Sequence, residues 1–125
     1  MPEMIVSRIT WALFLLSLLF TMLGAQAYAL LDHASPAVGS TVQRPPATVS
    51  LWFSEQLEPA FSSITVTDQA GRHVDGGDAR IDAADKTVLH ASLKPLSPGT
   101  YNVQWRVVSV DSHATESSFD FRVAG

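Results

Sequence analysis

An aspartate and a histidine stand two positions apart near the carboxyl end of the chain, in Asp111-Ser112-His113. If the backbone is extended there, side chains two positions apart point to one side, so a carboxylate and an imidazole converge. A nitrogen–oxygen pair of this kind suits Cu(II), Zn(II) or Ni(II). The same short motif also occurs as an ordinary surface hydrogen bond, and the residues alone leave both interpretations open.

Other residues that could bind a metal are scattered along the chain. Glu55 follows the run Trp52-Phe53-Ser54 and, taken alone, is typical of a solvated carboxylate at the end of a strand. His33 lies near the expected start of the folded domain. His73 stands beside a turn and His90 occupies an outward position in an alternating run, so we expect both at the surface.

No motif for catalysis by an activated nucleophile is present. The sequence has no G-x-S-x-G elbow, no H-E-x-x-H pair and no glycine-rich phosphate loop. The stretch 75–78 does not have the spacing of a calcium loop. With no candidate nucleophile better than a bare serine, we expect a protein that is not an enzyme.

Length and charge restrict the class of protein further. The chain has 125 residues, with 8 Lys and Arg, 12 Asp and Glu, and a net charge of −4. That length corresponds to one domain. An acidic balance argues against nucleic-acid binding, which needs a basic face.

The amino-terminal part has the features of a secretory signal. Arg8 precedes an apolar run over residues 9–23, and the small residues Ala25 and Ala27 give an A-x-A site. The run of about 15 residues is shorter than the roughly 20 that a bilayer span needs. We therefore expect residues 1–27 to be a signal peptide cleaved after Ala27, and residues 28–125 to form the domain. Cleavage after Ala29 and an uncleaved anchor are the alternatives.

Cleavage after Ala27 would leave a chain without sulfur ligands. There is no cysteine, and Met1, Met4 and Met22 all precede the cleavage site. Soft sulfur ligands are what select Cu(I). A metal site in the mature chain would therefore have only nitrogen and oxygen donors.

The domain is expected to be an all-β sandwich. Several short runs alternate polar and apolar residues or are rich in strand-forming residues, and Pro- and Gly-containing turns separate them. The runs cover residues 48–53, 64–67, 87–93, 100–107 and 119–123. No window has a helical stripe, and residues 75–85 have the composition of an exposed loop. This pattern predicts an immunoglobulin-like Greek-key β-sandwich of about seven strands.

Aromatic residues are expected to fill the space between the two sheets. They are Trp52, Phe53, Tyr101, Trp105, Phe119 and Phe121. Trp52 is the one that could instead line a site, because its neighbour Phe53 must point to the opposite face.

The mature chain resembles the CopC copper-resistance proteins over essentially its whole length. The resemblance rests on Pro36-Ala37-Val38-Gly39-Ser40, on Phe53-Ser54-Glu55, on Pro98-Gly99-Thr100-Tyr101 and on the run from Trp105 to His113. It implies a periplasmic Cu(II)-binding protein with a cupredoxin-like, immunoglobulin-like β-sandwich. It also implies that Asp111 and His113 bind the metal and that Glu55 lies at or near it.

One position departs from the family pattern. The family's third main ligand is a histidine at the mature amino terminus, and counting back from Pro36 places Tyr28 there. Tyrosine cannot supply an imidazole, but its free α-amine could still bind copper. We expect at least a 10- to 100-fold loss of Cu(II) affinity, because even the loss of a residue that hydrogen-bonds to a metal ligand has an effect of this size. His33 lies five residues further on, about 17 Å along an extended strand, too far to take that place unless the segment folds back.

These observations favour a periplasmic carrier or buffer of Cu(II). Two alternatives are an interaction module of the same fold with weak or no copper binding, favoured by Tyr28, and a copper oxidase, which would need the missing terminal histidine. The resemblance implies copper ion as partner and, further, a membrane copper transporter of the CopD type. We expect a monomer.

Overall fold

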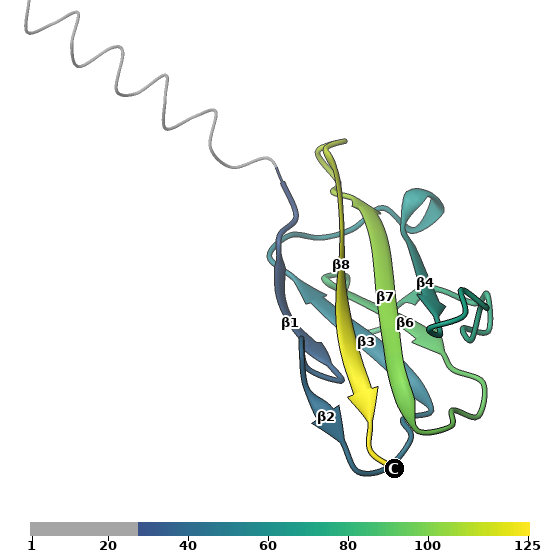
Figure 1. Ribbon diagram of the computed structural model, residues 1–125. Helices are drawn as coiled ribbons and strands as arrows, with labels where there is room; N and C mark the ends of the chain where they lie inside the picture. The colour runs from purple at the N-terminus through teal and green to yellow at the C-terminus, as the bar shows by residue number, and fades with distance from the viewer. Residues whose placement is uncertain (1–27) are drawn as a thin grey trace, which may run out of the picture.

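The computed structural model describes residues 28–125, and Figure 1 shows them as two β-sheets packed face to face. Residues 1–27, expected to be the signal peptide, lie outside the described residues. The strands are β1 (Leu31–Ser35), β2 (Thr41–Val42), β3 (Thr48–Phe53), β4 (Ser63–Thr67), β5 (Arg80–Ile81), β6 (Val88–Ser92), β7 (Gly99–Val108) and β8 (Ala114–Val123). A 3₁₀ turn, η1 (Pro59–Phe61), precedes β4. No helix in this part of the chain is long and apolar enough to cross a membrane.

Each sheet has four strands. One sheet has the order β1-β3-β6-β5 and the other the order β2-β8-β7-β4. All neighbours are antiparallel except β2 and β8, which run parallel. The predicted immunoglobulin-like sandwich is thereby confirmed. It has eight strands where about seven were expected, and two of the eight, β2 and β5, have only two residues each.

Alternation along the strands builds the core between the sheets. In β3, Val49, Leu51 and Phe53 are buried, while the residues between them face outward. In β7, alternate residues from Tyr101 to Val107 are buried in the same way. Burying one face of each sheet removes apolar area from water, which is the main favourable contribution to folding.

The expectation for the aromatic residues is confirmed except at one position. Five of the six are buried: Phe53, Tyr101, Trp105, Phe119 and Phe121. The rings of Phe53 and Trp105 meet edge to face across the core, with centroids 5.1 Å apart. Trp52 is only half-buried, because position 52 of β3 faces away from the second sheet.

The expected exposed loop over residues 75–85 is wrong in one respect. It contains β5, whose Arg80 and Ile81 pair with His90 and Leu89 of β6. Two residues are too few to show an alternating pattern, so the polar composition around them concealed the strand. This strand matters because it forms the edge of the first sheet and brings residues 80–82 beside β6.

Candidate metal centre

A tight turn between β7 and β8 holds the Asp111-Ser112-His113 motif. The N–H of Ser109 donates to the carbonyl of His113 at 3.0 Å, and the N–H of Ser112 donates to the carbonyl of Ser109 at 2.8 Å. Ser112 has a φ of 69°, in the left-handed region. A residue in the left-handed conformation at the last position of the loop is the usual way to close a three-residue hairpin loop. The turn fixes His113 as the residue that leads into β8.

This turn corrects the premise of an extended backbone at the motif. Because the chain reverses between Asp111 and His113, alternation along a strand does not bring their side chains together. Asp111 is exposed and Glu55 is half-buried. Within residues 28–125, no three His, Asp or Glu side chains are already gathered as a metal-binding group. The structure therefore presents single donors at one end of the sandwich, without an assembled ligand set.

His113 has the most distinctive environment of these donors. Its Nδ1 is buried and has no hydrogen-bond partner among the described residues. The ring of Tyr28 stands edge-on against the imidazole, with centroids 4.9 Å apart and planes at 68°. Leaving a buried polar atom unpaired costs about 1–3 kcal/mol, so such an atom calls for an explanation.

Three hydrogen bonds hold the start of the domain beside this histidine. Thr115 Oγ1 in β8 donates to the carbonyl of Ala29 at 2.7 Å, and Ala29 is fully buried. Leu30 and Ser54 are joined twice, from the Leu30 N–H to the Ser54 hydroxyl and from the Ser54 N–H to the Leu30 carbonyl, both at 2.9 Å. Residue 28 is thereby placed next to His113, and Figure 1 shows the start of β1 and the β7–β8 turn at the same end of the sandwich.

Glu55 belongs to a loop that pairs with the same turn. The N–H of Val110 donates to the carbonyl of Gln56 at 3.0 Å, and the N–H of Glu58 donates to the carbonyl of Val108 at 2.8 Å. These bonds lie directly after Glu55 in the chain and do not fix its carboxylate on His113. The three predicted side chains and residue 28 are thus brought to one end of the fold but not into mutual contact, except for Tyr28 and His113.

His33 has other partners. Its ring stacks on Trp52, with centroids 4.4 Å apart and planes at 12°, and its Nδ1 lies 2.8 Å from the Asp32 carboxylate. The segment does not fold back to place His33 against His113. Trp52 therefore packs on a histidine on the outer face of the first sheet.

The remaining histidines differ from each other. His73 is exposed, as expected, with its Nδ1 3.8 Å from the Asp75 carboxylate. His90 faces outward on β6, as expected, but is half-buried and hydrogen-bonded through both ring nitrogens, to Ser50 and to Asp82. Sequence reasoning missed this cluster because its members lie 40 and 8 positions apart.

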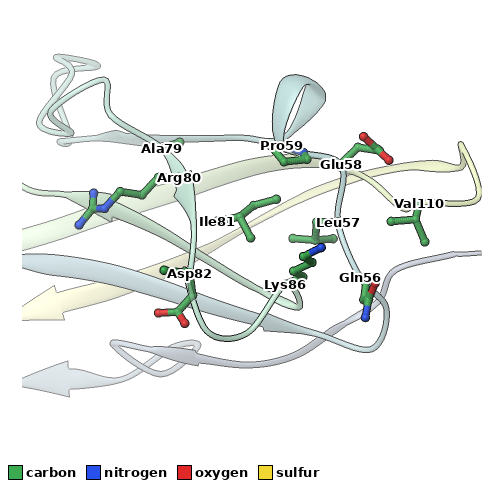
Figure 2. Close-up of a pocket in the computed structure, with 11 residues that line it drawn as sticks. Gln56, Leu57, Glu58, Pro59, Ala79, Arg80, Ile81, Asp82, Lys86 and Val110 are labelled. Atoms are coloured by element: carbon green, nitrogen blue, oxygen red, sulfur yellow. The ribbon is translucent and has the colours of Figure 1, made fainter.

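A cavity of about 490 Å³ lies beside the candidate centre without including it (Figure 2). Leu57 and Ile81 face each other across it, and Lys86 reaches toward Leu57. It ends at Gln56 and Val110, the neighbours in sequence of Glu55 and Asp111. None of the candidate donors lines it, so the site is a surface feature of the sandwich end.

Comparison with known proteins assigns the family. The CopC domain family matches residues 31–124, and the chain belongs to it. Protein YobA of Escherichia coli K12 is 37% identical over 98 residues, covering 78% of this chain and 79% of YobA. Copper resistance protein C of Xanthomonas campestris pv. juglandis is 37% identical over 105 residues, covering 79% and 82%. The crystal structure of CopC from Methylosinus trichosporium OB3b superimposes with a TM-score of 0.73 at 34% identity, covering 78% of this chain and 94% of that one.

Proposed function

We propose that the mature chain binds Cu(II) in the periplasm and carries or buffers it in copper resistance or homeostasis. Membership of the CopC family and a relative named copper resistance protein C support a role in copper handling. The observation that carries the proposal furthest is the buried, unpaired Nδ1 of His113. A copper ion would satisfy this nitrogen, which no protein donor or acceptor does among residues 28–125.

The other donors would come from chain segments that the fold brings to the same end. Cleavage after Ala27 would give residue 28 a free α-amine, and the Tyr28 ring already contacts the His113 ring. The carboxylate of Asp111 would come from the adjacent turn, and that of Glu55 from the loop paired with it. Because Asp111 is exposed and the donors are not preassembled, copper binding would have to order their side chains. The entropy lost in this ordering would lower the affinity for copper.

The donor types favour the oxidised ion. Residues 28–125 contain neither cysteine nor methionine, so only nitrogen and oxygen atoms are offered. Such ligands suit Cu(II) and hold Cu(I) poorly. We further propose that the protein is a monomer without enzymatic activity at this site and that it exchanges copper with a membrane transporter of the CopD type.

The test is a Cu(II) titration of the chain that begins at Tyr28, with a competing chelator to define the affinity. His113→Gln is expected to weaken binding at least 10-fold, and His73→Gln, at an exposed histidine, is the matched control that leaves it unchanged. Equal affinities of the two variants would overturn the proposed site. Binding no tighter in the unchanged protein than in His113→Gln would point instead to an interaction module of the same fold.

A further inference from the structure

Three side chains form a hydrogen-bonded relay on the outer face of the first sheet, apart from the candidate metal centre. Ser50 of β3 places its Oγ 2.7 Å from Nδ1 of His90 on β6. Nε2 of the same imidazole lies 2.8 Å from Oδ1 of Asp82, which follows β5. The three neighbouring strands β3, β6 and β5 thus each contribute, directly or at their end, one member of a serine–histidine–aspartate arrangement.

The surroundings of Asp82 determine the direction of these hydrogen bonds. The hydrogen bond with His90, followed by the one from the Ala84 N–H, holds the pKa of the Asp82 carboxyl below its usual value. The N–H groups of Ala84 and Asp85 donate to its Oδ2 at 2.9 and 3.0 Å. An ionised carboxylate only accepts, so Nε2 of His90 carries the hydrogen and Nδ1 presents its lone pair to the Ser50 hydroxyl.

This is the orientation of a general base that activates a serine. In such sites a carboxylate fixes the imidazole tautomer through one ring nitrogen, and the other nitrogen takes the hydroxyl proton. The arrangement is recognised by geometry and by these roles, and not by position in the sequence. Here the two ring nitrogens are exchanged relative to the serine proteases, but either nitrogen can act as the base when the other is held by the carboxylate.

The relay opens onto a cavity that a small molecule can enter. The cavity has a volume of about 450 Å³, and Thr48 and Arg80 line it together with the three relay residues. Figure 2 shows Arg80 and Asp82 projecting from one side of their strand while Ile81 projects from the other, toward Leu57. The His90 side chain is 22% exposed, so the base is reachable from solvent. Arg80 is the cation at this cavity. Its Nη1 forms an ion pair with the Asp78 carboxylate at 3.1 Å, so its other N–H groups are the ones that a developing negative oxygen would use.

We propose that Ser50, with His90 as base and Asp82 as positioning residue, is a nucleophile that cleaves small carboxylic esters. Ser50 Oγ bonds to the ester carbonyl carbon as its proton passes to His90 Nδ1. The carbon–oxygen bond to the alcohol then breaks, and the alcohol leaves with that proton. Water attacks the acyl-serine, gives a proton to Nδ1, and the acid departs as Ser50 regains its hydrogen. The net reaction is ester plus water giving acid plus alcohol.

The rate is expected to be modest. Ser50 lies within a strand whose N–H groups serve sheet pairing, so Arg80 is the donor left for the oxyanion. Loss of a single oxyanion donor in serine enzymes lowers the rate about 10²- to 10³-fold, and an incomplete set of oxyanion donors is expected to lower the rate here on the same scale. Activated esters are therefore the substrates with which the reaction can be seen.

The experiment uses the mature chain, freed of metal with EDTA, and p-nitrophenyl acetate. We expect nitrophenolate release above the buffer rate and an acetyl group on the peptide that contains Ser50, found by mass spectrometry. Ser50→Ala is expected to lose both signals, and His90→Gln to slow release about 10²- to 10⁴-fold, the usual contribution of a general base. Ser35→Ala is the matched control, because Ser35 pairs with Ser50 across β1 and β3 and is expected to leave the rate unchanged.

Two results would overturn the proposal. One is equal nitrophenolate release by Ser50→Ala and by the unchanged protein. The other is acetylation confined to lysine side chains or to the α-amine of the mature chain. Either result, with thermal unfolding showing that the variants are folded, would make the relay a cross-link between strands. The copper proposal does not depend on this outcome, since the assay is run without metal.

Discussion

The ring of Tyr28 meets the ring of His113 edge to face, with 4.9 Å between centroids. Residue 28 is the position at which the family resemblance predicts a terminal histidine, and His113 lies 85 positions further along the chain. The contact shows that the fold brings the start of the described chain beside the turn between β7 and β8. It also gives the first prediction its physical basis.

Tyr28→His, in a chain that starts at residue 28, is expected to raise the Cu(II) affinity about 10- to 100-fold. The new imidazole and the α-amine of one residue would close a chelate ring beside His113. Calorimetry with a competing chelator measures the change. The matched control is Leu30→His, which adds an imidazole at a neighbouring exposed residue and is expected to give no comparable gain. A similar gain from both variants would mean that position 28 has no special geometry.

Asp111→Asn is expected to weaken Cu(II) binding, because an amide oxygen is a poorer ligand than a carboxylate for a hard or borderline ion. The effect should be smaller than that of His113→Gln, since Asp111 is exposed and must move to reach the metal. The control is Asp32→Asn, whose carboxylate contacts His33 on the other segment. If Asp32→Asn weakened binding as much as Asp111→Asn, general negative charge and not coordination would explain the loss.

Thr115→Val is expected to lower the free energy of unfolding by about 1 kcal/mol and also to weaken copper binding. The hydroxyl of Thr115 holds the carbonyl of Ala29, and its loss leaves that buried carbonyl unpaired. Urea unfolding and a copper titration measure the two effects. Thr41→Val, at an exposed residue of β2, is the control. Unchanged copper affinity in a destabilised Thr115→Val would show that the terminal segment is not part of the site.

Acid is expected to destabilise the domain through four aspartates of the segment 68–85. The pKa values of Asp68, Asp78, Asp82 and Asp85 are lowered, mainly by hydrogen bonds from Arg72, Ser92, His90 and Thr87, respectively. A lowered folded-state pKa means that the folded state binds fewer protons than the unfolded state. The stabilisation is complete above about pH 5 and falls as the pH drops through the folded-state values. Unfolding in urea at several pH values should show this loss, with a shallower dependence in Asp82→Asn.

An equally steep acid dependence in Asp82→Asn would assign the effect to other carboxylates. Asp78 and Asp85 are exposed and Asp68 and Asp82 are half-buried at the surface, so solvent screens their contributions and the total effect is expected to be modest.

The longer strands were predictable because their buried residues alternate with exposed ones. Val49, Leu51 and Phe53 mark β3 in the sequence as clearly as in the structure. By contrast, β1 breaks the alternation with an irregularity between Leu31 and His33, and its sequence is polar. The first half of β8 was missed because its residues 114–118 are exposed apart from the half-buried, polar Thr115 and leave no apolar pattern.

The candidate site was only partly predictable, for reasons of backbone geometry and long-range pairing. The left-handed Ser112 turns the chain between Asp111 and His113, and no residue type in the motif requires that conformation. The contact of Tyr28 with His113 and the relay through Ser50 and His90 join residues far apart in the chain. Only the register of the strands places such residues together, and that register is a property of the whole sandwich.

The most direct test of copper binding at this end of the fold is an anomalous difference map. Crystals of the chain beginning at Tyr28 would be soaked in a cupric salt and measured at the copper absorption edge. The main peak is expected at bonding distance from Nδ1 of His113, with the Tyr28 amine and the Asp111 carboxylate as further ligands. A main peak at His33, His73 or His90, and none at His113, would contradict the account.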